Sequence, residues 1–222
     1  KMFERAIDLD PKFAEAHAAL SGVYVEEFWS NYSPDTAWIT KGELTAREAL
    51  ALDERLASAH ASLSFALRIK GRYKEALLEA VNALKIDPRY SFSLEDLSEF
   101  YRHRGEYGKA IAIAERAAAN DPSFNINRVR ARIYQFKGDY TASVTELRRA
   151  IERSPNDSWL RGGLLALSYI HLGDPASAEE EIKRAESVDP DKPETRISRA
   201  MLETLRGNFT RAQRDLDAVR DY

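Results

Sequence analysis

The side chains of this sequence that could do chemistry are four histidines and many carboxylates. The histidines are His17, His60, His103 and His171, and a catalytic or metal site would need such groups in a defined constellation. His17 and His60 occupy equivalent positions in two similar stretches, which favours packing over metal binding. There is no cysteine, so disulfides, thiolate catalysis and cysteine-based zinc sites are excluded.

Sequence motifs for catalysis are also missing. The chain has no phosphate loop of the type G-x-x-x-x-G-K-[ST] and no G-x-S-x-G nucleophile motif. Its carboxylates are spread over what reads as solvated helix surface. The sequence therefore predicts no catalytic residue, no metal site and no cofactor, and hence a protein that is not an enzyme.

Composition narrows the class of partner. The 222 residues are 44% hydrophobic and 31% charged, with a net charge of −3. A duplex-binding protein usually carries a basic surplus, so we expect no nucleic-acid partner. No apolar run approaches the roughly 18 residues that span a bilayer, so we expect no membrane partner. The opening KMFERAIDLDP reads as helix; we expect the sequence to begin inside a helical array, without its native N-terminus, in a cytoplasmic protein.

An internal repeat organises the chain. Glycines recur at intervals of 34, 33, 35 and 34 residues, and intervals of this length indicate a repeat architecture. The glycines are Gly71, Gly105, Gly138, Gly173 and Gly207. An aromatic or proline follows two residues after each, at Tyr73, Tyr107, Tyr140, Pro175 and Phe209. A small residue follows five after each, at Ala76, Ala110, Ser143, Ala178 and Ala212. Prolines close the units at Pro88, Pro122, Pro155 and Pro190.

Each repeated position has a physical role. Glycine supplies the backbone angles that end one helix and turn the chain. We expect the aromatic to pack into the elbow between two helices, and the small residue to let the helices approach closely. Proline stops the second helix because it lacks the N–H that a helix interior needs. Apolar residues between these marks recur at helical spacing, and no segment alternates like a strand.

These marks resemble the tetratricopeptide repeat family. The match is strongest at Leu94, Leu97, Tyr101, Gly105, Tyr107, Ala110, Ala117 and Pro122. The resemblance implies an all-α fold: a right-handed α-solenoid of stacked antiparallel helix pairs, stabilised mainly by contacts between neighbouring repeats. The predicted units are an orphan second helix at 1–10 and six pairs at 11–55, 56–88, 89–122, 123–155, 156–190 and 191–222.

The first predicted pair is longer than the others. The stretches DPKFAEAHAALSGVY and DERLASAHASLSFAL are offset by 43 residues. Ser33-Pro34-Asp35 forms a good helix start, so both helices of this pair are expected to be extended. Phe28, Trp29, Tyr32 and Trp38 gather at the overhang. They form either a local core or an exposed patch for a partner. The long first unit also resembles arrays attached to bacterial signalling and regulatory proteins.

The resemblance also implies a binding surface. In this family the first helix of each pair lines a concave groove, and its groove positions can be carried onto this sequence. The predicted partner-binding residues are Phe65, Arg68, Phe92, Glu95, Glu99, Arg102, His103, Asn125, Arg128, Arg132, Gln135, Phe136 and His171. Their mixture of aromatic, acidic and basic side chains suits an extended peptide.

Two alternatives stay open at this surface. Glu95 and Glu99 occupy the same repeat positions as Arg128 and Arg132. These charges either form salt bridges between repeats or select a ligand of matched charge. The groove lacks the Lys/Asn set with which the chaperone-tail branch of the family clamps a carboxylate, so we do not predict a cochaperone.

The predicted function is a non-catalytic scaffold that binds a protein or peptide segment in its concave groove. The alternative is a self-associating structural arm, a homodimer for example, that positions an attached regulatory or catalytic domain. Arg196, Arg199 and Glu203 stand at positions that are apolar in other repeats, so the last pair is expected to have fewer buried contacts.

Overall fold

The protein is all-α in the computed structural model, which describes residues 1–31 and 37–220; within these ranges there are helices and no strand. The helices pack as consecutive pairs, which confirms the predicted α-solenoid fold class. Contacts divide the chain into two compact units, Lys1–Phe124 and Asn125–Tyr222.

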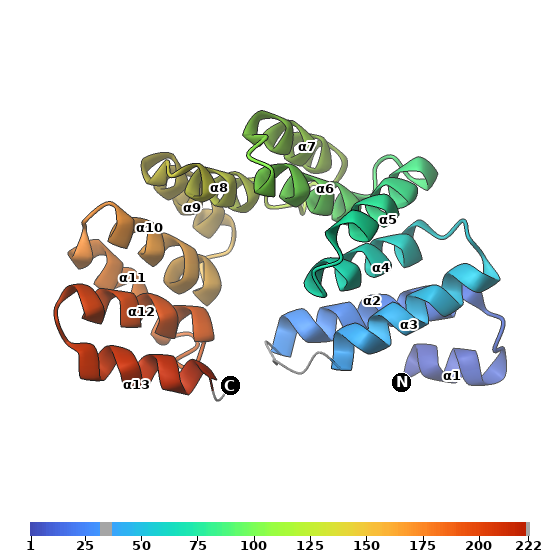
Figure 1. Ribbon diagram of the computed structural model, residues 1–222, viewed down its shortest axis with the longest axis horizontal. Coiled ribbons are helices and arrows are strands. Elements are labelled where there is room, and N and C mark those ends of the chain that lie inside the picture. The colour runs from blue at the N-terminus through green and yellow to red at the C-terminus, as the bar shows by residue number, and fades with distance from the viewer. Residues whose placement is uncertain (32–36, 221–222) are drawn as a thin grey trace. The chain divides into compact units, whose positions relative to one another are not determined.

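The first unit contains a short leading helix and three helix pairs (Figure 1). α3 packs on α2, α5 on α4 and α7 on α6, and α4 also contacts α2 and α6. The helices are α1 (Met2–Leu9), α2 (Ala14–Asn31), α3 (Ala37–Leu52), α4 (Ala57–Ile69), α5 (Tyr73–Ile86), α6 (Ser91–His103) and α7 (Tyr107–Asn120).

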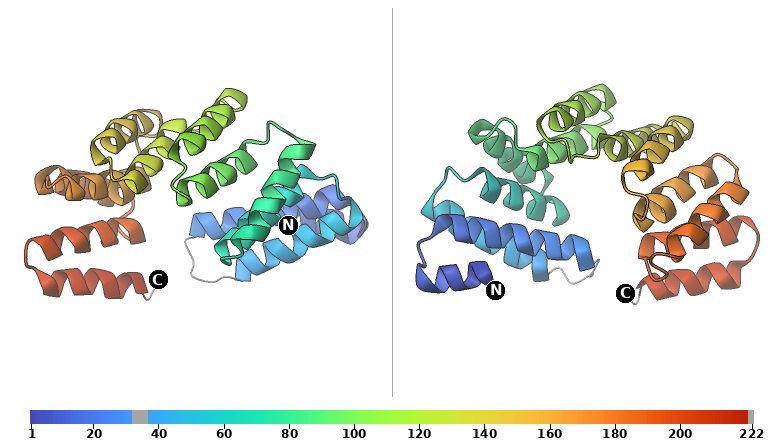
Figure 2. Two further views of the ribbon diagram at one scale, coloured as in Figure 1. Left: turned by 45° about the horizontal axis from the view of Figure 1, so that its top comes forward. Right: turned by 180° about the vertical axis from the view of Figure 1, so that it is seen from behind.

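The second unit contains three further pairs, and the last of them is drawn in red in both views of Figure 2. The first helix of its middle pair starts as a π-helical segment, η1, and continues as α10. The segments are α8 (Ile126–Lys137), α9 (Tyr140–Arg153), η1 (Trp159–Leu165), α10 (Ala166–His171), α11 (Pro175–Glu186), α12 (Pro193–Leu205) and α13 (Phe209–Arg220).

The five repeated glycines end the first helices α4, α6, α8, α10 and α12, as predicted. At Gly105, φ is 74°, a left-handed conformation that glycine adopts at little steric cost. The N–H of Gly105 donates to the Arg102 carbonyl at 3.0 Å, and the N–H of Glu106 donates to the Tyr101 carbonyl at 2.9 Å. This pair of hydrogen bonds is a Schellman motif, which satisfies carbonyls at the helix end. The other four repeated glycines also have positive φ.

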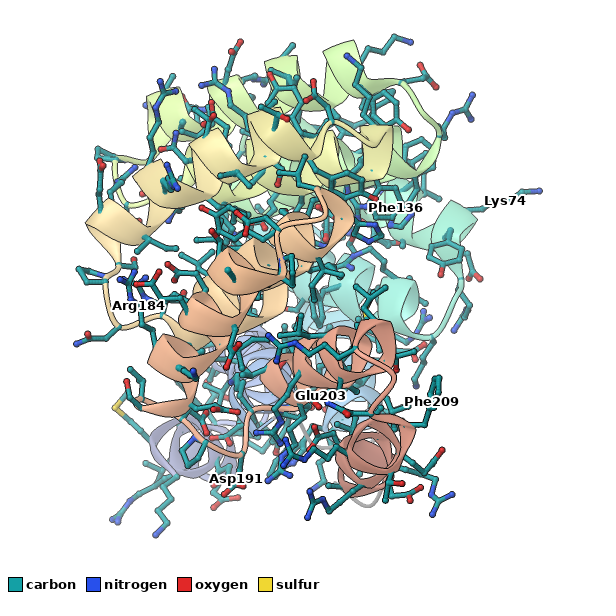
Figure 3. The ribbon with its side chains drawn as sticks, turned by 90° about the vertical axis from the view of Figure 1, so that its left-hand side faces the viewer. Lys74, Phe136, Arg184, Asp191, Glu203 and Phe209 are labelled. Atoms are coloured by element: carbon teal, nitrogen blue, oxygen red, sulfur yellow. The ribbon has the colours of Figure 1, made fainter. Side chains whose placement is uncertain are left out.

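The small residues five positions after the glycines are buried, as predicted. Ala110, Ser143 and Ala178 are fully covered at the contact between the two helices of their pairs. The prediction for the aromatic two residues after the glycine is wrong at two positions. Tyr73 is 60% exposed and Phe209 is 68% exposed, because each begins its helix where no other helix covers it; Phe209 points outward in Figure 3.

The extended first pair is partly described. α2 has 18 residues, compared with 13 in α4. The predicted helix start at Ser33-Pro34-Asp35 lies outside the described residues, and so do Tyr32 and the Trp29 side chain. Of the predicted aromatic cluster, Phe28 packs against buried residues that include Ile39 and Phe65. The Trp38 ring centroid lies 5.7 Å from that of Tyr24. Both rings are half-buried.

A close helix contact in the second unit depends on glycine. Gly162 lies in η1 and faces α12. A β-carbon at this position would lie 2.1 Å from Thr195 Oγ1 and 2.9 Å from the Ala185 β-carbon. Both distances are shorter than van der Waals contact, so glycine is required where α11, α12 and η1 meet.

His60 joins the two helices of its pair. Its Nδ1 lies 2.6 Å from Glu79 Oε2 and its Nε2 lies 3.0 Å from the Glu54 carbonyl oxygen. Both partners are acceptors, so the charged imidazolium can donate to both. The hydrogen bond to Glu79 raises the pKa of His60 above its ordinary value of 6.5, although burial acts in the opposite direction.

This geometry predicts a pH-dependent contribution to stability. A raised folded-state pKa means that the contribution of His60 is complete below pH 6.5 and is lost as the pH rises through the folded-state pKa. We expect the destabilisation caused by His60→Gln, measured by urea unfolding, to shrink between about pH 6 and pH 9. Glu79→Gln should flatten the pH dependence, and a destabilisation that grows with pH would contradict the assignment.

Candidate partner-binding surface

In the first unit, the predicted aromatic residues form a layered cluster on α4 and α6. Phe65 is fully buried, and its ring centroid lies 6.4 Å from that of Phe28 and 5.8 Å from that of Phe92. Phe92 is 36% exposed. Phe65 therefore supports the surface from beneath, while Phe92 presents its ring to solvent.

Arg68 lies beside this cluster and is held by a buried carboxylate. Its guanidinium carbon is 4.8 Å from the centre of the Phe65 ring. Its Nε donates to Asp96 Oδ1 at 3.0 Å, and the Ser64 hydroxyl donates to Asp96 Oδ2 at 2.9 Å. Burial raises the pKa of Asp96, and the charge of Arg68 acts against this effect. The Arg68 side chain is thus fixed by Asp96 and the Phe65 ring and remains half-buried.

The charged residues predicted on α6 lie at different depths. Glu99 and Arg102 are 3% and 2% exposed and form an ion pair within one turn of the helix. Arg102 also donates to His103 Nε2 at 3.0 Å. His103 is exposed and Glu95 is half-buried. The outer layer of this surface is therefore formed by Phe92, Glu95 and His103, with the Glu99–Arg102 pair below it.

In the second unit, two predicted residues have structural hydrogen bonds. Asn125 caps α8, because its side-chain oxygen accepts from the Arg128 N–H at 3.2 Å. Gln135 donates to the Leu164 carbonyl oxygen at 2.9 Å and to Ser168 Oγ at 2.8 Å. The Asn125 bond caps α8, and the Gln135 bonds join α8 to η1 and α10. Both side chains therefore have a role in the fold.

Other predicted residues of the second unit lie nearer the surface. Phe136 is 54% exposed at the end of α8 (Figure 3). The His171 ring stacks on Tyr140 at 4.3 Å between centroids. Arg128 lies 5.9 Å from the Trp159 ring centre, and both Arg128 and Arg132 are half-buried. The predicted pairing of α6 glutamates with α8 arginines would join the two units and stays a prediction.

Arginines of the last pair form ion pairs. Arg199 Nε donates to Asp215 Oδ2 at 2.7 Å, and its guanidinium also pairs with Glu186. Arg196 pairs with Asp191. These contacts explain how polar residues occupy positions that are apolar in the other repeats.

Within residues 1–31 and 37–220, no group of three or more His, Cys, Asp or Glu side chains is placed to hold a metal ion. Over the same described ranges, none of the helices combines the length and apolar character needed to cross a membrane.

Sequence reasoning missed the buried carboxylate Asp96. It lies next to Glu95 in α6, and both residues look like helix surface in the sequence. The available signal was the pattern around it, because Ser93, Leu94 and Ser98 are also buried. Small hydroxyl side chains on this face allow the carboxylate to reach Ser64 and Arg68 of α4.

Two protein-family models match parts of this chain. Models described as tetratricopeptide repeat match residues 93–126 and 137–202. A tetratricopeptide repeat protein from Parabacteroides merdae is 16% identical and has a similar structure; the match covers 99% of this chain and 83% of that chain, with a TM-score of 0.75. The human IFIT1 dimer with m7Gppp-AAAA is 17% identical over 98% of this chain and 53% of that chain, with a TM-score of 0.79.

A bacterial relative shares part of the sequence. Cellulose synthase operon protein C of Xanthomonas axonopodis pv. citri is 33% identical over 95 residues, which is 43% of this chain and 6% of that protein. The match thus spans a small part of that relative's length. The tetratricopeptide fold is generally a non-catalytic scaffold for protein interactions. Repeat spacing, helix pairing and family matches agree, and the chain therefore contains tetratricopeptide repeats.

Proposed function

We propose that the chain is a non-catalytic scaffold that binds a protein or peptide segment on the faces of its first helices. The observation that carries the proposal is the Phe92 ring, which is 36% exposed and rests on the fully buried Phe65. An exposed aromatic on a rigid base loses little conformational freedom on binding, which is typical of residues that dominate interface energies.

Charges beside the aromatic residues support recognition of a mixed peptide. Arg68 is held in place by Asp96 at 3.0 Å. Glu95 lies one turn after Phe92 on α6, and His103 lies at the end of that helix. In the second unit, Phe136 offers another exposed aromatic with Arg132 on the same helix. Fixed charges near apolar anchors favour one sequence of apolar and charged residues over others.

The proposal predicts that Phe92 contributes strongly to peptide binding. We expect peptides selected from a displayed library on the purified chain to bind Phe92→Ala about tenfold to thirtyfold more weakly, as for other interface aromatics. Isothermal titration calorimetry would measure the change. The control is Leu78→Ala, because Leu78 is 56% exposed on the second helix α5. Equal losses for the two variants, or no selected peptide at all, would contradict the proposal.

The alternative function is self-association that positions an attached domain. Several apolar side chains of the last pair are exposed, including Leu205 at 67% and Phe209 at 68%. Light scattering over a concentration series separates the two functions. A monomer mass at every concentration supports the scaffold, whereas a dimer that Phe92→Ala disrupts supports self-association through the same face. The cytoplasmic location and the absence of nucleic-acid binding expected from the sequence stay predictions.

A further inference from the structure

A pocket of about 320 Å³ opens between α4, α5 and α6 in the first unit. Its walls are mainly apolar and include Ala76, Leu77, Ala80 and Phe100. A mostly apolar pocket of this size, with a few fixed polar groups, is typical of ligand sites. It lies beside the turn between α4 and α5, next to Tyr73, and shares Arg68 and His103 with the predicted binding surface.

A small residue lines the pocket at a position where the second unit has larger ones. Ala80 stands nine residues after its repeat glycine, where the first unit also has Ala114 and the second unit has Leu147, Ile182 and Leu216. Leu147 and Ile182 are buried and fill the space between their helices. A protein interior normally leaves few voids larger than a water molecule. Ala80 is 1% exposed, and its methyl group lines the pocket where those repeats have a branched side chain.

The polar groups of the pocket are already arranged. Asp96 is 6% exposed and accepts from Arg68 and Ser64 at 3.0 and 2.9 Å, so its negative charge is compensated inside the wall. At the mouth, the Arg104 guanidinium carbon lies 5.6 Å from the centre of the Phe100 ring, and the Arg104 side chain is 61% exposed. The Arg104 Nε donates to Glu106 Oε1 at 2.6 Å. The mouth therefore combines an aromatic face with an exposed guanidinium whose other N–H groups can bind a second carboxylate.

We propose that this pocket holds an aromatic side chain of a partner peptide that carries a carboxylate next to the aromatic residue. The ring would pack on Phe100 and Leu77 over the gap at Ala80, and the carboxylate would bind the Arg104 guanidinium, a strong charge-assisted contact. The proposal rests on the proposed scaffold function, and it adds the chemical class of the segment that is recognised.

The test uses N-acetyltryptophan, which has the aromatic ring and the carboxylate, and NMR spectra of the chain's alanine and leucine methyl groups. We expect millimolar binding, typical of a fragment of this size, with shifts at Ala76, Leu77 and Ala80. N-acetyltryptophan amide should bind at least about threefold more weakly, because it lacks the charge, and N-acetylalanine should not bind. No shift at these methyl groups would overturn the proposal.

Two variants sharpen the result. Ala80→Leu should fill the pocket, abolish binding and leave the thermal unfolding midpoint unchanged or higher. Ala112→Leu is the matched control, since Ala112 is exposed on α7, and it should bind like the wild type. If Ala80→Leu does not fold, Arg104→Glu provides the test of the proposal. That variant should bind the acid no better than the amide, and a retained preference for the acid would overturn the proposal.

Peptide selection separates this proposal from the scaffold function. Selected peptides that lack an aromatic–acidic pair and bind Ala80→Leu as well as the wild type would overturn the pocket and leave the scaffold intact. Failure to select any peptide, while N-acetyltryptophan still binds, would overturn the scaffold instead. Selected peptides that are rich in such pairs and fail to bind Ala80→Leu would support both.

Discussion

Gly162→Ala should lower the free energy of unfolding by about 2–4 kcal/mol, which is at or above the usual range for an overpacked core. The added methyl group would lie 2.1 Å from Thr195 Oγ1 and 2.9 Å from the Ala185 β-carbon. Both neighbours are buried and belong to packed helices, so relief requires a shift of η1, α11 or α12. Urea unfolding followed by circular dichroism would measure the loss.

Gly108→Ala is the matched control for this prediction. Gly108 lies in α7, and a β-carbon there meets nothing within 4 Å. Alanine at this position should stabilise the helix by about 0.5–1 kcal/mol, because glycine is a poor helix former. Adding Thr195→Ala to Gly162→Ala removes the closest clash and should recover part of the stability. Wild-type stability for Gly162→Ala would show that the close contact in η1 is incorrect.

Glu43→Ala should destabilise the first unit by about 2–3 kcal/mol, as expected when one partner of a buried ion cluster is removed. Glu43 is 7% exposed in α3. Its carboxylate accepts from Arg47 at 2.9 Å, Lys70 at 2.7 Å and Arg72 at 2.9 Å. The carboxylate thus ties α3 to the turn that follows α4. The control is Glu75→Gln, which removes a carboxylate that is 54% exposed and should cost under about 1 kcal/mol.

The same cluster predicts an acid-sensitive contribution to stability. Burial alone would raise the pKa of Glu43, but hydrogen bonds from Lys70 and Arg47 lower it to about 2. Because the folded-state pKa is depressed, the contribution is complete above the ordinary value of 4.5 and is lost as the pH falls towards 2. The stability difference between wild type and Glu43→Gln should shrink over that range. A difference that stays constant with pH would contradict the assignment.

The helix pairs could be predicted because the repeat marks act locally. Gly105 ends α6 by its own backbone conformation, and Ala110 is small where two helices touch. Such requirements recur in the five pairs from α4 onwards and are visible without knowledge of distant contacts. The exposed aromatics Tyr73 and Phe209 show the limit of this reasoning, because a repeated residue type does not ensure that a neighbour covers it.

The depth of the surface residues could not be predicted from helical spacing. Periodicity gives the direction in which a side chain points, whereas burial depends on the neighbouring helix. Phe65 is covered because Phe28 of the longer α2 reaches it, and Glu99 and Arg102 lie below the surface of α6. The close contact of the π-helical segment Trp159–Leu165 with α12 likewise depends on a helix distant in sequence.

The pocket beside Ala80 could be predicted from the sequence only in part. Its signal was present in the sequence, since the ninth residue after each glycine can be compared between repeats. The comparison gains meaning when the structure shows that Leu147 fills the equivalent space. A single alanine in a helix is otherwise unremarkable, and its effect depends on the three helices that surround it.

The most direct test of the scaffold account is site-specific photo-crosslinking of a selected peptide. A photoreactive phenylalanine analogue would replace Phe92 on the first helix α6 and, in a second protein, Leu78 on the second helix α5. Both residues are exposed and apolar. We predict that the peptide crosslinks to position 92 and not to position 78. Crosslinking at position 78 alone would show that the partner binds the second helices and would contradict the central claim.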